Sequence, residues 1–341
     1  MKVILPDGFD DHRGKTPGDD STKADIPLTP DMRSEEAARI ILRCLLQVIR
    51  INEPHLAQDR DTEFLHDFRV AIRRTRSALR QMKNVFPVEI AKRFRKDFSF
   101  VGNLSNELRD LDVHLQKEGP YKAMLPPGLH CDIDPLFDYL REKRAKAFRE
   151  FLRQLKTRKY KQIFRKWDLF LNGPRRDSAP STNADLPVIR LARKRIYKKF
   201  RGILKDGNEI LDNTEDGKLH RLRIECKELR YLLEFFASLF PRKKIRGLIE
   251  QLKKLQDILG EFNDFRVQEQ HLQDIVGELA ETGSLSKKTG AATGSLIKAL
   301  EREKQTAKKA FAKTFPDYAS ASNRKVFQEL FNPGSDPLTL S

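Results

Sequence analysis

Residues 66–80 read HDFRVAIRRTRSALR, and residues 220–234 read HRLRIECKELRYLLE. Both stretches follow the pattern H-x2-R-x3-[RK]-x2-R. On an α-helix each residue advances by about 100°, so the histidine and the cations of this pattern share one face. In both stretches a stripe of apolar residues lies directly beside that face. The pattern therefore predicts two helices, each with one stripe that packs and an adjacent stripe that can hold an anion.

The two stripes are read directly from the sequence. The cationic stripes, which we expect to bind a polyanion, consist of His66, Arg69, Arg73, Arg76 and Arg80 in the first copy and of His220, Arg223, Lys227 and Arg230 in the second. The apolar stripes, which we expect to pack, consist of Leu65, Phe68, Ile72, Leu79 and Met82 and of Leu219, Leu222, Cys226, Leu229, Leu233 and Phe236.

The overall charge supports the same interpretation. The chain has 341 residues and a formal net charge of +17. A surplus of this size is typical of proteins that bind nucleic acid, an anionic membrane or polymeric phosphate. No apolar run approaches the roughly 18 residues of a membrane span, and the apolar start is too short for a signal peptide. Because Cys44, Cys131 and Cys226 lie far apart, we expect no disulfide, no zinc site and a cytoplasmic location.

Helical periodicity extends over most of the chain, and no alternating stretch is long enough to predict a sheet. Helices are predicted near residues 34–52, 62–86, 88–112, 136–171, 188–211, 218–240, 248–265, 296–315 and 323–331. Segments rich in glycine, proline or polar residues separate them. These segments are predicted to be a flexible leader, a loop, a linker, a second loop and a flexible tail, at residues 1–28, 119–135, 172–187, 282–295 and 332–341.

A shift of 154 residues brings the two motifs and their surroundings into register without a gap. The residues that it pairs include His66 and His220, Arg73 and Lys227, Phe86 and Phe240, Asp110 and Asp264, and Arg39 and Arg193. Agreement at one spacing indicates an internal repeat. We therefore expect an all-α fold of two homologous four-helix bundles, residues 29–171 and 188–331, related by a pseudo-twofold axis.

The doubled motif resembles that of the CHAD domain, the conserved histidine α-helical domain. In that family each motif helix is followed by a helix that carries Asp, and here those segments are LRDLD at 108–112 and FNDF at 262–265. The resemblance covers about residues 31–331. It implies two four-helix bundles around a basic channel that binds inorganic polyphosphate, in proteins often found on polyphosphate granules. Glu234 departs from the pattern, because the first half has Arg80 there, so we expect unequal contributions from the halves.

Polyphosphate carries about one negative charge per phosphate and has no bases to read, so cations alone must recognise it. Besides the motif helices, the candidate contacts on neighbouring helices are Arg39, Arg43, Lys92, Lys96 and Arg193. Cations gathered in the empty protein repel one another, and a bound polyanion should relieve that repulsion and raise thermal stability. The sequence contains no phosphate-cradling glycine loop of the G-x4-G-K-[ST] type. We therefore expect a binding protein that needs no cofactor, and not an enzyme.

Other functions would use the same residues. Nucleic acid would also bind to these cations, although aromatic residues are not arranged as a stacking platform. A metal-dependent phosphohydrolase would need ligands from His66, His220, Asp110, Asp112 and Asp264, but the nearby cations would repel a metal ion. We therefore expect no metal, and we expect these Asp residues to orient arginines. A structural scaffold would leave the repeated cations unexplained.

Three points stay open at the level of sequence. The two histidines either contact phosphate or only form hydrogen bonds within the protein. The cations line either one channel or two separate grooves. The oligomeric state is not encoded in any motif of the chain.

Overall fold

The computed structural model describes residues 26–59, 61–174, 181–212 and 215–332. Within these ranges the chain forms twelve α-helices and three short 3-10 helices, and the only extended pairing is a single bridge between Arg33 and Pro187. The predicted all-α fold is confirmed. Residues 1–25 and 333–341, which make up most of the predicted leader and tail, lie outside the described residues.

The first half of the chain, through Asn172, contains seven α-helices. They are α1 (Ser34–Asn52), α2 (Thr62–Gln81), α3 (Val88–Asn103), α4 (Asn106–Gln116), α5 (Glu118–Ala123), α6 (Asp134–Leu155) and α7 (Arg158–Asn172). Two 3-10 helices, η1 (Glu53–Gln58) and η2 (Pro127–Leu129), lie in the connections.

The second half contains five α-helices. They are α8 (Val188–Asp212), α9 (Asp216–Phe235), α10 (Arg242–Glu281), α11 (Lys287–Tyr318) and α12 (Ala321–Phe331), with η3 (Ala237–Leu239) between α9 and α10. The first three of these helices begin 154 residues after α1, α2 and α3, and α9 also ends 154 residues after α2. The helix bounds thus repeat at the spacing found in the sequence, which supports the predicted internal repeat.

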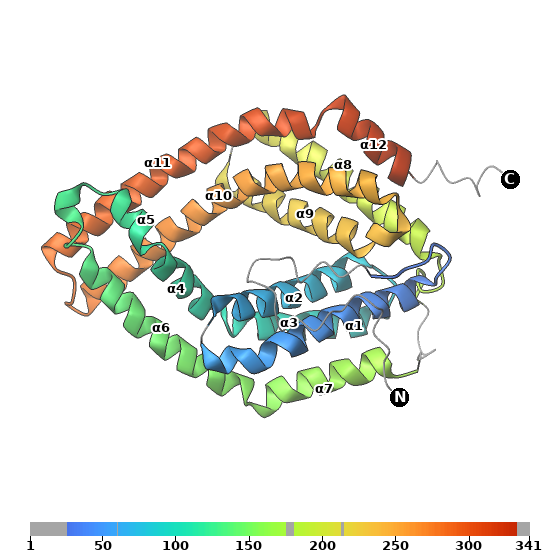
Figure 1. The fold of residues 1–341 in the computed structure, drawn as a ribbon, viewed down its shortest axis with the longest axis horizontal. Coiled ribbons are helices and arrows are strands. Elements are labelled where there is room, and N and C mark those ends of the chain that lie inside the picture. The colour runs from blue at the N-terminus through green and yellow to red at the C-terminus, as the bar shows by residue number, and fades with distance from the viewer. Residues whose placement is uncertain (1–25, 60, 175–180, 213–214, 333–341) are drawn as a thin grey trace.

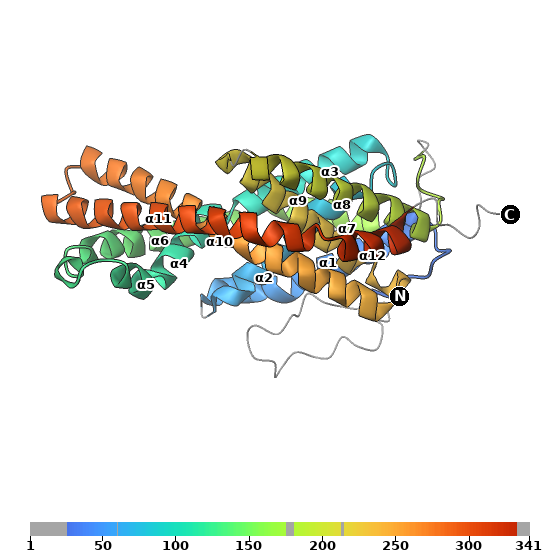
Figure 2. The ribbon, with the colours of Figure 1, turned by 90° about the horizontal axis from the view of Figure 1, so that it is seen from above.

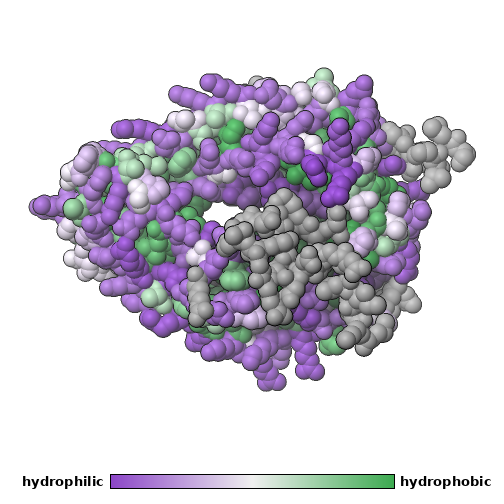
Figure 3. All heavy atoms as spheres, in the orientation of Figure 1, coloured by the Kyte–Doolittle hydropathy of each residue, from purple (hydrophilic) through white to green (hydrophobic). Residues whose placement is uncertain are grey.

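The two halves form an elongated ring (Figures 1 and 2). In the first half α1, α2, α3 and α7 pack on one another, and in the second half α8 packs on α9 and α12 while α9 packs on α10. The halves contact each other where α2 meets α9 and α1 meets α8, and again where α6 meets α11. Figure 3 shows an opening between the halves whose visible border is largely hydrophilic. We therefore looked for the predicted anion-binding residues around the space between the halves.

Aromatic side chains fill the core of each half. In the first half the ring of Trp167, which is fully buried, lies 4.6 Å from that of Phe94 and 5.1 Å from that of Phe98. In the second half Phe200 stacks on Phe327 at 3.7 Å. Each fully buried aromatic side chain of this kind contributes about 2–3 kcal/mol through burial. The two cores hold the motif helices in fixed orientations.

The predicted helix over 136–171 was wrong, because the structure contains two helices there. Helix α6 ends at Leu155, and Thr157 begins α7 as its N-cap, with the hydroxyl accepting a hydrogen bond from the backbone N–H of Tyr160 at 3.3 Å. The predicted helix over 88–112 is also divided, between α3 and α4. Ser105, which separates them, is fully buried.

Both predicted loops contain more helix than expected. The segment 119–135 includes most of α5, all of η2 and the start of α6. The segment 282–295 is mostly helical, because Ser286 caps α11 by accepting a hydrogen bond from the N–H of Thr289 at 3.0 Å. Its glycine and threonine content suggested a loop, but Ala292 and Thr293 are fully buried, and tertiary packing overrides their weak helix propensity.

The end of the predicted flexible leader is packed against the second half. Ile26 and Leu28 are buried in the core. The hydroxyl of Ser238 donates a hydrogen bond to the carbonyl of Ile26 at 2.7 Å and accepts one from the N–H of Leu28 at 3.2 Å. Residues 26–28 therefore belong to the folded part of the chain.

Candidate functional site

The two motif helices, α2 and α9, bury their apolar stripes as predicted. Asp61 caps α2 by accepting a hydrogen bond from the N–H of Glu63 at 2.8 Å. Every predicted packing residue is less than 9% exposed, and the set comprises Leu65, Phe68, Ile72, Leu79, Met82, Leu219, Leu222, Cys226, Leu229, Leu233 and Phe236. Burial of these stripes fixes the rotation of each helix. The adjacent cationic stripes are thereby turned toward the space between the halves.

A cavity of about 820 Å³, which we call the channel cavity, lies between α2, α3 and α9. Its lining residues are Arg73, Arg76, Ser77, Arg80, Lys92, Arg95, Lys96, Ser99, Arg223, Ile224, Lys227, Glu228 and Tyr231. Within the described part of the chain, eight cations and one carboxylate thus line it. Cations from both motif helices meet in this one cavity, which favours one channel over two separate grooves.

Arg73 lies at the centre of the cationic cluster. Its charge acts on Arg69 and His66 of its own helix and on Arg223 and Lys227 of α9, and it lowers the pKa of all four. For each of these groups burial is the larger cause. Arg73 therefore couples the two motif helices electrostatically.

The charged form of Lys227 is destabilised by its surroundings. Burial, followed by the charges of Arg223, Arg73 and Arg230, lowers the pKa of its ammonium to about 7, and Asp264 opposes the effect. Burial, followed by the charge of Arg73, also lowers the pKa of Arg69, to about 10. Cations held together and away from water in this way are stabilised by an incoming anion.

The two histidines have different surroundings. Burial, followed by the charges of Arg109 and Arg73, lowers the pKa of His66, so its ring is neutral at neutral pH. The ring of His220 donates a hydrogen bond from Nδ1 to the side-chain oxygen of Asn263 at 2.6 Å. That bond leaves Nε2 of His220 as the ring nitrogen that is not engaged by Asn263. The question of phosphate contact stays a prediction for both rings.

The Asp residues of the repeat do interact with arginines. Asp112, which is buried, accepts a hydrogen bond from Nε of Arg144 at 2.8 Å. Asp264 lies 3.7 Å from a terminal nitrogen of Arg223. Asp110 acts electrostatically on Arg69 and lies 3.9 Å from Nε2 of His271. These contacts agree with the predicted orienting role and hold the carboxylates beside cations.

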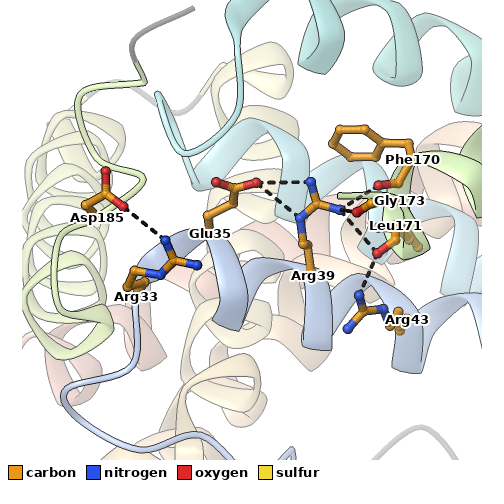
Figure 4. A network of polar contacts seen from close by, with 8 residues as sticks. All are labelled: Arg33, Glu35, Arg39, Arg43, Phe170, Leu171, Gly173 and Asp185. Carbon is orange, nitrogen blue, oxygen red and sulfur yellow. Dashed lines mark hydrogen bonds and ion pairs between the residues drawn. The ribbon is translucent and has the colours of Figure 1, made fainter. Parts of the chain in front are cut away.

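Arg39 and Arg43, which were predicted as anion contacts, have other partners (Figure 4). Arg39 donates to the carbonyl of Phe170 at 2.5 Å and also pairs with Glu35 at 3.0 Å. Arg43 donates to the carbonyl of Leu171 at 2.6 Å. Both arginines therefore satisfy carbonyls at the C-terminus of α7, where cations are favoured. Neither lines the channel cavity, and the same holds for Arg193, which is half-buried on α8.

Two further residues of the second motif face each other and not the cavity. Arg230 lies 3.4 Å from Glu234 on the same helix. Glu234 also pairs with Arg74 of α2 at 3.0 Å, and the side chain of Arg74 is only 5% exposed. Glu234, which stands where the first half has Arg80, thus forms an ion pair at the contact between the halves.

The sequence prediction omitted Arg95, which lines the channel cavity. Burial, followed by the charge of Arg95, lowers the pKa of both Arg76 and Arg80. Its position could have identified it. Lys92, Arg95, Lys96 and Ser99 follow the i, i+3, i+4, i+7 spacing of one helix face. All four line the cavity.

Neither a metal centre nor a membrane segment is evident in the described ranges. No group of three or more His, Cys, Asp or Glu side chains there is placed to hold a metal ion. Among the helices of the same ranges, none combines the length and the apolar composition that a membrane span requires.

Comparison with known proteins places this geometry in a family. The CHAD domain model matches residues 40–273. The crystal structure of the CHAD domain from the plant Ricinus communis is 25% identical, covers 85% of this chain and 95% of that chain, and has a TM-score of 0.67. PptA from Streptomyces chartreusis is 14% identical, covers 83% of this chain and 99% of that chain, and shares the fold with a TM-score of 0.62.

A curated relative is similar to part of this chain. The uncharacterized protein MT2285 of Mycobacterium tuberculosis (strain CDC 1551 / Oshkosh) is 24% identical over 213 residues, which make up 61% of this chain. The match spans only 39% of the length of that relative. The match of the family model over more than half of the chain shows that this protein belongs to the CHAD domain family.

Proposed function

We propose that this protein binds inorganic polyphosphate in the channel cavity and holds it without cleaving it. The observation that supports this most is the excess of cations there, eight against one carboxylate among the described residues. The carboxylate, Glu228, is itself engaged by Arg80 and by Lys199. The empty cavity therefore carries a net positive charge. A flexible, highly charged polyanion would reach and neutralise the cations on all of its walls.

The shape of the site favours a thin polymer. The cavity has walls from three helices, and the cations of α2 from Arg73 to Arg80 extend over about 10 Å at about 1.5 Å per residue. Among the described residues of its lining Tyr231 is the only aromatic one, so stacked bases would find little support. These features support polyphosphate over nucleic acid.

Binding without catalysis is supported by the state of the nearby carboxylates. Asp112 and Asp264 lie beside arginines, where they are poorly placed to hold a divalent metal ion. A protein that binds long polyphosphate would also collect on polyphosphate granules. We include this location in the proposal, and imaging of a fluorescent fusion in granule-forming cells tests it.

The decisive experiment measures binding of fluorescent long-chain polyphosphate at physiological salt, with DNA and RNA as competitors. One variant, which we call the channel variant, combines Arg73→Ala, Arg76→Ala, Arg95→Ala and Lys227→Ala. A control variant removes four exposed cations of α6 and α7, through Arg149→Ala, Lys161→Ala, Arg165→Ala and Lys166→Ala. We expect the first variant to lose binding and the control to retain it. Equal loss in both variants, or displacement by nucleic acid, would refute the proposal.

A further inference from the structure

A second basic cavity, which we call the side cavity, adjoins the channel cavity. It has a volume of about 440 Å³ and lies between the end of α2 and the helices α8 and α9. Arg80, Ile224 and Glu228 line both cavities. The two cavities are therefore neighbours that share one wall.

The side cavity is also rich in cations. Its lining contains Arg80, Lys83, Arg195, Lys198, Lys199 and Arg221. Within the described residues, two carboxylates oppose these six cations. Lys199 lies 3.6 Å from one of them, Glu225, and 2.9 Å from the other, Glu228. An excess of four positive charges remains, which is the condition for binding a further anionic segment.

Arg195 shows that this cavity withholds a cation from water. Its Nε is buried and has no hydrogen-bond partner among the described residues. One terminal nitrogen lies 3.4 Å from the carbonyl of Lys83, which makes a long hydrogen bond. Burial lowers the pKa of this guanidinium, and within the described part of the chain no carboxylate contributes to the shift. A phosphate oxygen in the cavity would be a better acceptor for the terminal N–H groups of Arg195 than this distant carbonyl.

The side cavity does not arise from the repeated motif. The residues that correspond to Arg195 and Lys199 at the 154-residue shift are Ile41 and Leu45, which are buried in the core of the first half. Arg195 and Lys199 are thus cations that the first half lacks at the equivalent positions. This is why the doubled motif alone did not reveal them.

The wall between the cavities contains an ion pair between Arg80 and Glu228. Glu228 is buried and pairs with Arg80, while the side-chain amide of Gln81 donates to it at 2.6 Å. Arg80 is 44% exposed, so it can turn from Glu228 to a phosphate. Glu228 would then keep the hydrogen bond from Gln81 and the contact with Lys199 at 2.9 Å.

We propose that a long polyphosphate chain passes from the channel cavity, along Arg80, into the side cavity, which acts as a distal subsite for the same molecule. This inference rests on the proposed function. It predicts that the side cavity contributes only to chains long enough to reach it. Short and long polyphosphates therefore separate the two cavities experimentally.

The test compares tripolyphosphate with long-chain polyphosphate in direct binding assays. The side-cavity variant combines Lys83→Gln, Lys198→Gln and Arg221→Gln, three exposed residues whose replacement leaves the core intact. We expect its affinity for the long chain to fall about tenfold and the slope of log K against log salt to decrease by about 2, because three phosphate contacts are lost. Its affinity for tripolyphosphate should stay within about twofold of the wild type.

A control variant removes the same charge from exposed positions on α6 and α7, through Arg149→Gln, Lys161→Gln and Lys166→Gln. It should bind both ligands like the wild type. An equal decrease for both chain lengths, or no decrease for the long chain, would overturn the distal subsite. Failure of the proposed function itself looks different, because the channel variant would then bind both ligands normally.

Discussion

Polyphosphate binding should be accompanied by proton uptake at Lys227. In the free protein its pKa is about 7, because the ammonium is buried beside Arg223, Arg73 and Arg230. A phosphate against the ammonium should return this pKa toward the ordinary value near 10.4. At pH 8 about nine tenths of the lysine is neutral in the free protein and charged in the complex, so binding takes up about 0.9 proton. At pH 6 the uptake falls to about 0.1 proton.

The sign of the pH dependence follows from this difference. Well below pH 7 the lysine is already almost fully protonated in the free protein, so its titration hardly affects the affinity. Above pH 7 each complex must acquire a proton, so the affinity falls with rising pH by up to about tenfold per unit. The groups facing this ammonium that set the effect are Arg73 on α2, Arg223 and Arg230 on α9, and Asp264 on α10.

Calorimetry in two buffers of different ionisation enthalpy measures the uptake directly. Long polyphosphate chains are used so that their titrating end groups contribute little to the measured proton uptake. The variant Lys227→Arg serves as the reference because its guanidinium stays charged. The wild type should take up about 0.9 proton more than this variant at pH 8. Equal uptake by the two proteins at pH 8 would refute the assignment of the shifted group to Lys227.

Three other predictions concern stability. Gly207→Ala should destabilise the fold by about 1–3 kcal/mol in urea unfolding, because a Cβ there would overlap the buried ring of Phe315. Gly247→Ala should instead stabilise it by about 0.5–1 kcal/mol, because within the described residues its Cβ would meet no atom within 4 Å beyond its chain neighbours and the backbone of its own helix. Thr157→Ala should cost about 1 kcal/mol through loss of the α7 cap; an unchanged unfolding midpoint would contradict that role. Long-chain polyphosphate at 100 times its Kd should add about 2.7 kcal/mol, seen as a raised Tm that the channel variant does not show.

The fold could be predicted because an apolar stripe is a local pattern and because the repeat is found by comparing the sequence with itself. Leu65 and Leu219 are buried where helical periodicity places them, and α9 begins 154 residues after α2. The breaks within helices were not readable in the same way. The cap at Thr157 and the helix that includes Thr293 depend on which residues become buried, and burial is a property of the tertiary fold.

The candidate site was readable only in part. The stripe from Arg73 to Arg80 lines the channel cavity, and Lys92 and Lys96 do as well. Arg39 has the same spacing and charge as a site residue, yet it donates to carbonyls of α7, which lies 131 residues away in sequence. Spacing identifies the face of a helix, but the neighbour that covers this face decides whether a cation meets a carbonyl or a ligand.

The contact between the halves explains where the repeat has diverged. Two ion pairs join α2 to α9, Arg74 with Glu234 and Arg80 with Glu228. The 154-residue shift relates Arg74 to Glu228 and Arg80 to Glu234, so the two pairs occupy equivalent places with both cations on α2 and both anions on α9. If two copies of α2 met at this contact, arginine would face arginine. If two copies of α9 met there, glutamate would face glutamate. The reversal of charge therefore favours pairing of unlike halves within the chain.

The same divergence makes the binding site unequal. Lys92, Arg95 and Lys96 of α3 line the channel cavity, and the residues at the corresponding positions of α10 are Arg246, Ile249 and Glu250. The side cavity, in contrast, takes its added cations from the second half, mainly from α8. Each half therefore supplies cations at a different place along one continuous basic surface, and a single extended polyanion is the ligand that would contact both.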